Sequence, residues 1–138
     1  MAGDHLTLRT RPGTAERLGR KARSTGIPAR TLAARYLDEG LRREDHPQIN
    51  FMDGATGRRA ALAGTGLDVW EVIATVRDNG NDVAQAADYL ELPESVIAAA
   101  VTYYGEFKGE IDAEIALNEE ESRRGLEAIA AGEAALRS

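Results

Sequence analysis

The sequence contains no cysteine and only two histidines among 138 residues. The absence of cysteine excludes a disulfide framework and a thiolate nucleophile. The two histidines, His5 and His46, have no carboxylates at metal-ligand spacing around them, which argues against a transition-metal site. We therefore expect the chain to bind no metal and no other cofactor.

Long hydrophobic runs are also missing. No apolar run approaches the roughly 20 residues of a membrane span, and the first residues lack the apolar core of a signal peptide. We expect a soluble cytoplasmic protein that does not contact membranes. A chain of 138 residues fits one domain or two small ones.

The motifs of common enzyme classes are absent from the sequence as well. It has no P-loop, no dinucleotide fingerprint and no nucleophile elbow, and Gly64-Thr65-Gly66 lacks both the following glycines and a lysine. Acidic pairs are plentiful but lie on predicted exposed helix faces, with no apolar surroundings to raise a pKa. We expect a binding protein rather than an enzyme, with no catalytic residues.

Charge is distributed unevenly along the chain. The net charge is −6, but ten Arg or Lys and three Asp or Glu lie between His5 and Arg43, giving that segment +7 and the remainder −13. A basic segment and an acidic remainder indicate two different binding roles.

Residues 1–45 are predicted to form a strand and two helices. His5 to Arg9 alternates polar and apolar residues, which predicts a short strand with Leu6 and Leu8 on one face. A helix is expected from Thr14 until Gly26, where a left-handed residue is favoured. A second helix opens at Pro28, with an apolar stripe formed by Leu32, Ala33, Tyr36, Leu37 and Leu41. About forty residues bury too little core alone, so we expect a homodimer or higher oligomer.

This order of elements, over about Leu6 to Leu41, resembles the ribbon-helix-helix repressors, in which two chains pair their strands into a ribbon. The resemblance implies DNA binding through the major groove, with the ribbon contributing His5, Thr7 and Arg9. It also implies that the backbone N–H groups of Ala29 and Arg30 meet a phosphate. Pro28 and Ala29 replace the usual Ser or Thr of that position. The alternative is a basic, solvated helix pair.

Residues 46–105 predict a hairpin followed by three helices. Ile49 and Phe51 alternate with polar residues before Asp53-Gly54, and Ala60 and Leu62 alternate after it, which is typical of a hairpin. Asp68 and Glu71 form a capping box ahead of the first helix, which Asn79-Gly80 ends. Trp70 is the expected large core residue.

The stretch from Asp82 to Tyr104 predicts two short helices joined by a tight turn, typical of a helix-turn-helix unit. Asp82 is the expected N-cap of the first helix, and Pro93 the expected first residue of the second. The second helix is acidic and alanine-rich and offers no Arg, Lys, Asn or Gln to base edges. We therefore interpret it as a protein-binding or dimer-forming module.

The region from about Ile49 to Ile115 also resembles a family of small prokaryotic antitoxin-like proteins (VapB-like) of type II toxin–antitoxin systems. The matching residues are Gly57, Arg58 or Arg59, Gly64, Val69 and Tyr103-Tyr104. The resemblance implies a PIN-domain ribonuclease toxin as the partner.

Residues 106–138 predict an acidic helix that is marginal by itself, because Gly125 and Gly132 each cost about 1 kcal/mol of helix propensity. We expect the segment to order on a partner. In the family resembled, such a tail wraps the toxin, and an arginine can occupy the toxin's acidic metal site. The candidate toxin-binding residues are Ile111, Ile115, Arg123 and Arg124. Pairing of these arginines with Glu119 and Glu120 on a solvated helix is the alternative.

Together these patterns predict a mainly α protein with three parts. They are a ribbon-helix-helix-like DNA-binding and dimerisation unit (1–45), a hairpin plus helix-turn-helix module (46–105) and a toxin-binding helical tail (106–138). The predicted function is that of an antitoxin, which binds operator DNA as a dimer and neutralises a ribonuclease toxin. A stand-alone dimeric transcription regulator and a scaffold that never touches DNA are the alternatives.

Overall fold

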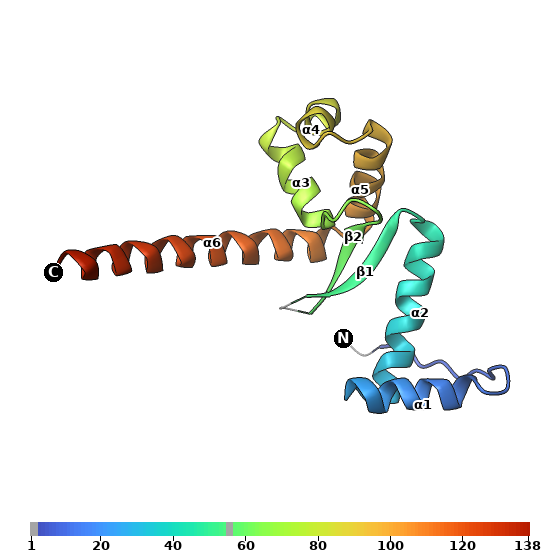
Figure 1. Cartoon of the computed structure of the whole chain (residues 1–138). Helices are drawn as coiled ribbons and strands as arrows, with labels where there is room; N and C mark the ends of the chain where they lie inside the picture. Colours follow the sequence, from blue (N-terminus) through green and yellow to red (C-terminus); the bar gives the residue numbers. More distant parts are fainter. Residues whose placement is uncertain (1–2, 55–56) are drawn as a thin grey trace. The chain divides into compact units, whose positions relative to one another are not determined.

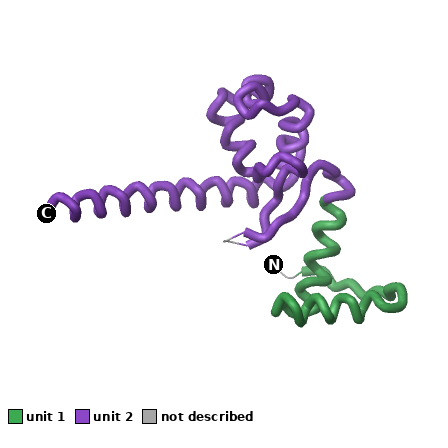
Figure 2. Tube along the Cα trace, viewed as in Figure 1, with its two compact units in different colours: residues 1–42 green, residues 43–138 purple. Residues whose placement is uncertain are grey.

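The computed structural model describes residues 3–54 and 57–138, which form a mainly helical protein with one small antiparallel sheet (Figure 1). The chain divides into two compact units, residues 1–42 and residues 43–138, which we call unit 1 and unit 2 (Figure 2). Within the described residues, no helix combines the length and the apolar character needed to cross a membrane.

Unit 1 contains an N-terminal segment, α1 (Thr14–Thr25) and most of α2 (Ala29–Asp45). Gly26 ends α1 as predicted: it is left-handed, with φ 71°, and its N–H donates to the carbonyl of Ala22 at 2.9 Å. Leu32 of α2 is buried, whereas α1 buries none of its residues. Unit 1 therefore has very little core of its own.

The strand predicted from His5 to Arg9 is not formed in the single chain. The segment has no regular secondary structure, and it pairs with no strand among the described residues. Leu6 and Leu8 are 66% and 61% exposed. In a two-chain ribbon each strand takes its hydrogen-bonding partner from the other chain, so a single chain leaves this segment unpaired. The ribbon-helix-helix arrangement stays a prediction.

The predicted hairpin of unit 2 is present as β1 (Ile49–Gly54) and β2 (Gly57–Leu62), which pair antiparallel. Ile49 lies opposite Leu62 and Gly54 lies opposite Gly57. Asp53 and Gly54, predicted to form the turn, are instead the last residues of β1. The register buries both Ile49 and Leu62, and a slip of one residue would move their side chains to the other face. Residues 55 and 56 lie outside the described residues.

Three helices follow the hairpin: α3 (Val69–Asp78), α4 (Val83–Leu90) and α5 (Glu94–Glu106). The capping box predicted before α3 is confirmed, and the backbone N–H of Asp68 donates to Oε1 of Glu71 at 3.1 Å. Asp82 caps α4 by accepting from the N–H of Gln85 at 3.2 Å. Pro93 lies at the N-cap of α5, one position before the predicted one.

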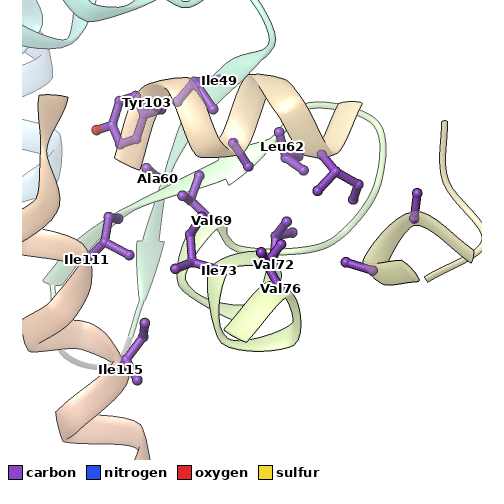
Figure 3. Close-up of a cluster of buried hydrophobic side chains, with 14 residues drawn as sticks. Ile49, Ala60, Leu62, Val69, Val72, Ile73, Val76, Tyr103, Ile111 and Ile115 are labelled. Atoms are coloured by element: carbon purple, nitrogen blue, oxygen red, sulfur yellow. The ribbon is translucent and has the colours of Figure 1, made fainter. Parts of the chain in front are cut away.

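The core of unit 2 gathers apolar residues from the hairpin and from four helices (Figure 3). Tyr103 of α5 is its largest fully buried side chain. Trp70, the predicted large core residue, is only partly buried. Its indole N–H donates to Oδ2 of Asp68 at 3.2 Å, which keeps the ring at the edge of the core because the polar N–H needs a partner.

The long final helix, α6 (Lys108–Arg137), belongs to unit 2. Ile111 and Ile115 on its first turns are buried in the core, at 1% and 6% exposure. From Glu121 onward every residue is exposed, and Figure 1 shows this part continuing beyond the rest of unit 2. The segment predicted as a separate tail therefore contributes its first turns to the core.

Candidate functional site

The candidate DNA-contacting residues of unit 1 are accessible. His5, Thr7 and Arg9 lie in the N-terminal segment and are exposed. Ala29 and Arg30 are the first two residues of α2, where backbone N–H groups have no partner within the helix. Both groups of residues belong to unit 1 and can be offered to a ligand without unfolding any element.

The apolar residues of unit 1 are exposed as well. Besides the two leucines of the N-terminal segment, α2 exposes Tyr36, Leu37 and Leu41, which are 46%, 46% and 60% accessible. Leu37 and Leu41 lie on one face of the helix because they are four positions apart, and Tyr36 lies about 100° around the helix from Leu37. A second molecule of complementary shape would cover this apolar surface.

The candidate toxin-binding residues on α6 separate into two groups. Ile111 and Ile115 pack in the core of unit 2, so their side chains are not available to a partner. This moves the candidate partner-binding surface to the exposed part of the helix. The large apolar residues there are Leu126, Ile129 and Leu136.

Arg123 and Arg124 lie on this exposed part and pair within the helix. Arg123 bonds both Glu120 and Glu127, and Nε of Arg124 lies 3.1 Å from Oε1 of Glu120. The predicted partner of Arg123 was Glu119, but in the structure Arg123 pairs with Glu120, three positions before it. Exposed pairs of this kind contribute only a few tenths of a kcal/mol, so both arginines can exchange partners at low cost.

A network of ion pairs and hydrogen bonds fixes the start of α6 to α3 and α5. Asp112 accepts from Lys108 (2.6 Å), from the Tyr104 hydroxyl (2.7 Å) and from Arg77 (2.5 Å). Hydrogen bonds from Lys108 and Tyr104 lower the pKa of Asp112 below its usual range. The same contacts raise the pKa of Arg77 and of Lys108.

A cleft of about 300 Å³ lies in unit 2 between the hairpin, the start of α3 and α6. On its hairpin side, Nε of Arg59 lies 2.9 Å from the carboxylate of Asp68, which also accepts from the Trp70 indole. Asp68 is therefore fully matched by donors. The cleft is lined by Gly54, Arg58, Arg59, Asp68, Trp70, Ala113, Glu114, Leu117, Asn118 and Glu121.

Glu114 also lines the cleft, but one of its carboxyl oxygens has no hydrogen-bond donor among the described residues. Its Oε2 atom is buried and accepts no hydrogen bond from the described residues. Burial, together with the nearby charges of Asp68 and Glu110, raises the pKa of Glu114 to about 7, against the opposing effect of Arg59. Near neutral pH the cleft therefore holds a carboxyl group that is half charged and whose Oε2 has no donor among the described residues.

The sequence patterns did not predict the contacts of His46 with Glu106 and Tyr103, nor the position of Glu114. Nε2 of His46 lies 2.7 Å from Oε2 of Glu106, sixty positions along the chain, and the imidazole packs edge-on against Tyr103. No spacing rule connects these positions. Glu114 left a weak signal, since it follows Ile111 by three positions and therefore lies beside the buried stripe of α6.

Comparison with models of protein families, with curated proteins and with solved structures finds no match. Residues 3–54 and 57–138 contain no group of three or more His, Cys, Asp or Glu that could hold a metal ion. The functional assignment therefore rests on the sequence patterns and on the two kinds of surface described above: a basic one in unit 1 and an acidic one in unit 2.

Proposed function

We propose that the protein is the antitoxin of a type II toxin–antitoxin system. Two copies pair through the segment His5–Arg9 of unit 1, and the paired units bind operator DNA. The exposed part of α6 binds and neutralises a PIN-domain ribonuclease toxin.

The observation that carries this proposal is that both units leave apolar side chains uncovered on surfaces of opposite charge. Unit 1 exposes Leu6, Leu8 and Leu41 within the basic segment. Unit 2 exposes Leu126, Ile129 and Leu136 on an acidic helix. Exposed apolar residues grouped on one element are typical of binding surfaces, and opposite charges favour two different partners.

Accessible N-terminal side chains support the DNA-binding part of the proposal. His5, Thr7 and Arg9 are exposed in the N-terminal segment, where a strand paired with that of a second chain would present them to the major groove. Phosphate neutralisation by unit 1 would make binding fall steeply with salt.

The DNA-binding role is tested by replacing Arg9 with Ala and measuring binding to DNA from the protein's own promoter in gel-shift assays. We expect a loss of at least about fivefold, because a bidentate arginine contact to a base is worth about 1–3 kcal/mol. Arg124→Ala removes the same charge from unit 2 and is the matched control, which should bind as the unchanged protein does. Equal affinities for both variants would contradict the assignment.

The toxin-binding role needs a test that keeps unit 2 folded. Ending the chain at Glu106 would remove Ile111 and Ile115 from the core. A cleaner variant is Leu126→Asp, at a position 69% exposed. We expect it to lose co-purification with the ribonuclease encoded next to the gene and to lose protection of cells from that ribonuclease.

Ala128→Asp is the control for this variant, because it adds the same charge about 200° around the helix from Leu126. It should retain toxin binding. If Leu126→Asp protects cells as well as Ala128→Asp does, the role of α6 is wrong. A protein that binds its promoter with no effect on the neighbouring ribonuclease would instead be a stand-alone transcription regulator.

A further inference from the structure

The cleft between the hairpin, α3 and α6 is not used by the function proposed above. We propose that it binds the guanidinium group of an arginine side chain from a protein partner, with Glu114 as the acceptor and Trp70 as the apolar wall. The argument concerns residues of unit 2 alone.

The charges around Glu114 favour a cation. On the hairpin side, Arg58 pairs with Asp53 at 3.2 Å and Arg59 pairs with Asp68 at 2.9 Å. These four charges compensate one another in pairs. Glu114 and Glu121, both from α6, are the remaining charged groups of the lining, and Glu110 adds a further negative charge near Glu114. Among the described residues of the lining, Glu114 and Glu121 therefore leave the cleft with an uncompensated negative charge.

The unmatched oxygen of Glu114 shows where the cation would bind. A buried carboxylate oxygen without a donor costs free energy, which a bound donor recovers. A charged donor is favoured over a neutral one because hydrogen bonds between ions are about twice as strong. The carboxyl group of Glu114, which lines the cleft, is thus the expected acceptor.

The shape and the lining of the cleft favour a guanidinium over other cations. A volume of about 300 Å³ accommodates one side chain, since ligand pockets for whole small molecules start near that size. The indole of Trp70 and the side chain of Leu117 give the cleft apolar surface. A flat, weakly hydrated guanidinium packs on aromatic and apolar surface better than an ammonium does.

The position of the cleft on α6 favours a protein as the source of the arginine. The residues that α6 contributes, from Ala113 to Glu121, come directly before its fully exposed part. Ile129 and Leu136 follow Asn118 by eleven and eighteen positions, which are three and five turns, so they lie on the same face of α6 as this residue of the cleft. A protein that lies along Ile129 and Leu136 would extend to the mouth of the cleft. This identification of the partner rests on the proposed function, whereas binding of the guanidinium does not.

The test uses the full chain and two small probes, Nα-acetyl-argininamide and the uncharged isostere Nα-acetyl-citrullinamide. Trp70 is the only tryptophan in the sequence, so its fluorescence and its indole N–H resonance report on the cleft directly. We expect a saturable change at millimolar arginine probe and at least tenfold weaker binding of the citrulline probe. Binding should be tighter at pH 8 than at pH 6, because Glu114 loses its proton in between.

Glu114→Gln keeps the shape of the side chain and removes its charge, and we expect it to weaken the arginine probe at least fivefold and to abolish the pH dependence. Glu119→Gln, at an exposed position outside the cleft, should bind as the unchanged protein does. Equal response to both probes, or unchanged binding by Glu114→Gln, overturns the proposal. An unchanged far-ultraviolet circular dichroism spectrum confirms that each variant is folded.

The outcomes separate this inference from the antitoxin assignment. Saturable binding of the arginine probe, together with intact protection of cells by Leu126→Asp, would support the cleft and contradict the role of α6. Loss of protection in Leu126→Asp, with no response of Trp70 to the arginine probe, would contradict the cleft alone.

Discussion

Asp68 and Glu114 line the same cleft, yet their carboxyl groups are in opposite situations. Asp68 accepts from Arg59 and from the Trp70 indole, so its charge is compensated. The carboxyl group of Glu114 lines the same cleft, but its Oε2 atom accepts no hydrogen bond from the described residues. The two carboxyl groups differ in their hydrogen-bond donors. Arg59 of the hairpin donates to Asp68, whereas no described residue donates to Oε2 of Glu114.

This contrast leads to a prediction for the pH dependence of stability. The pKa of Glu114 is raised from 4.5 to about 7 in the folded protein, so the folded state holds this proton more tightly than the unfolded state does. The contribution of Glu114 to the free energy of unfolding should therefore fall as pH rises from about 4.5 to about 7 and stay low above that. Because the group is partly solvated, we expect a cost of about 1–2 kcal/mol at pH 8.

Urea unfolding at pH 5 and at pH 8 measures this cost. Glu114→Gln should match the unchanged protein at pH 5 and exceed its free energy of unfolding at pH 8. Glu119→Gln changes an exposed carboxylate of the same helix and should show the pH dependence of the unchanged protein. A Glu114→Gln variant with that same pH dependence would contradict the burial effect.

The connection between α4 and α5 places a residue with a Cβ in the left-handed backbone conformation. Glu91 ends α4 in the left-handed conformation, with φ 57° and ψ 44°, and the N–H of Leu92 donates back to the carbonyl of Ala87 at 3.0 Å. This is a helix C-terminus that usually carries glycine. Residues with a Cβ adopt it at a cost of about 1–2 kcal/mol.

We therefore expect Glu91→Gly to raise the free energy of unfolding by about 0.5–1 kcal/mol, since the greater freedom of glycine in the unfolded chain offsets part of the gain. Glu91→Ala removes the same carboxylate from the helix C-terminus but keeps the Cβ. The difference between the two variants in urea unfolding reports the backbone effect. Identical midpoints would show that the turn is not strained.

Local patterns predicted these elements well, whereas contacts between distant residues escaped them. The capping box at Asp68 and the end of α1 at Gly26 depend on residues within four positions, and both were predicted from the sequence. Trp70 was expected in the core that Tyr103 occupies, because packing among hairpin, α3 and α5 decides which aromatic ring is enclosed. The same limit hid the cleft, whose lining residues come from three separated segments.

At the scale of the whole molecule, the two units differ in how complete they are. Unit 2 encloses a core that runs from Ile49 to Ile115. Unit 1 buries Leu32 but exposes most of its other large apolar residues. A unit of about forty residues rarely supplies enough core by itself, which is why we expect it to require a second copy.

Leu8→Asp tests this requirement. Leu8 is 61% exposed in the single chain, and burying it in a ribbon contributes about 1.5–3 kcal/mol, so we expect the dimer dissociation constant to rise at least tenfold in sedimentation equilibrium. Thr7→Asp places the same charge on the other face of the segment. It should remain dimeric while losing affinity for DNA. A Leu8→Asp variant that dimerises normally would exclude the ribbon as the dimer contact.

The burial of Ile115 also determines the order in which the chain matures on the ribosome. Unit 2 cannot close its core until Ile115 has been made. At roughly 5–20 residues per second, synthesis of residues 43–115 takes about 4–15 s. Unit 1 emerges well before that, with its leucines uncovered. The proposed pairing of two copies through unit 1 would therefore be able to begin between neighbouring nascent chains on one message, before either has completed unit 2.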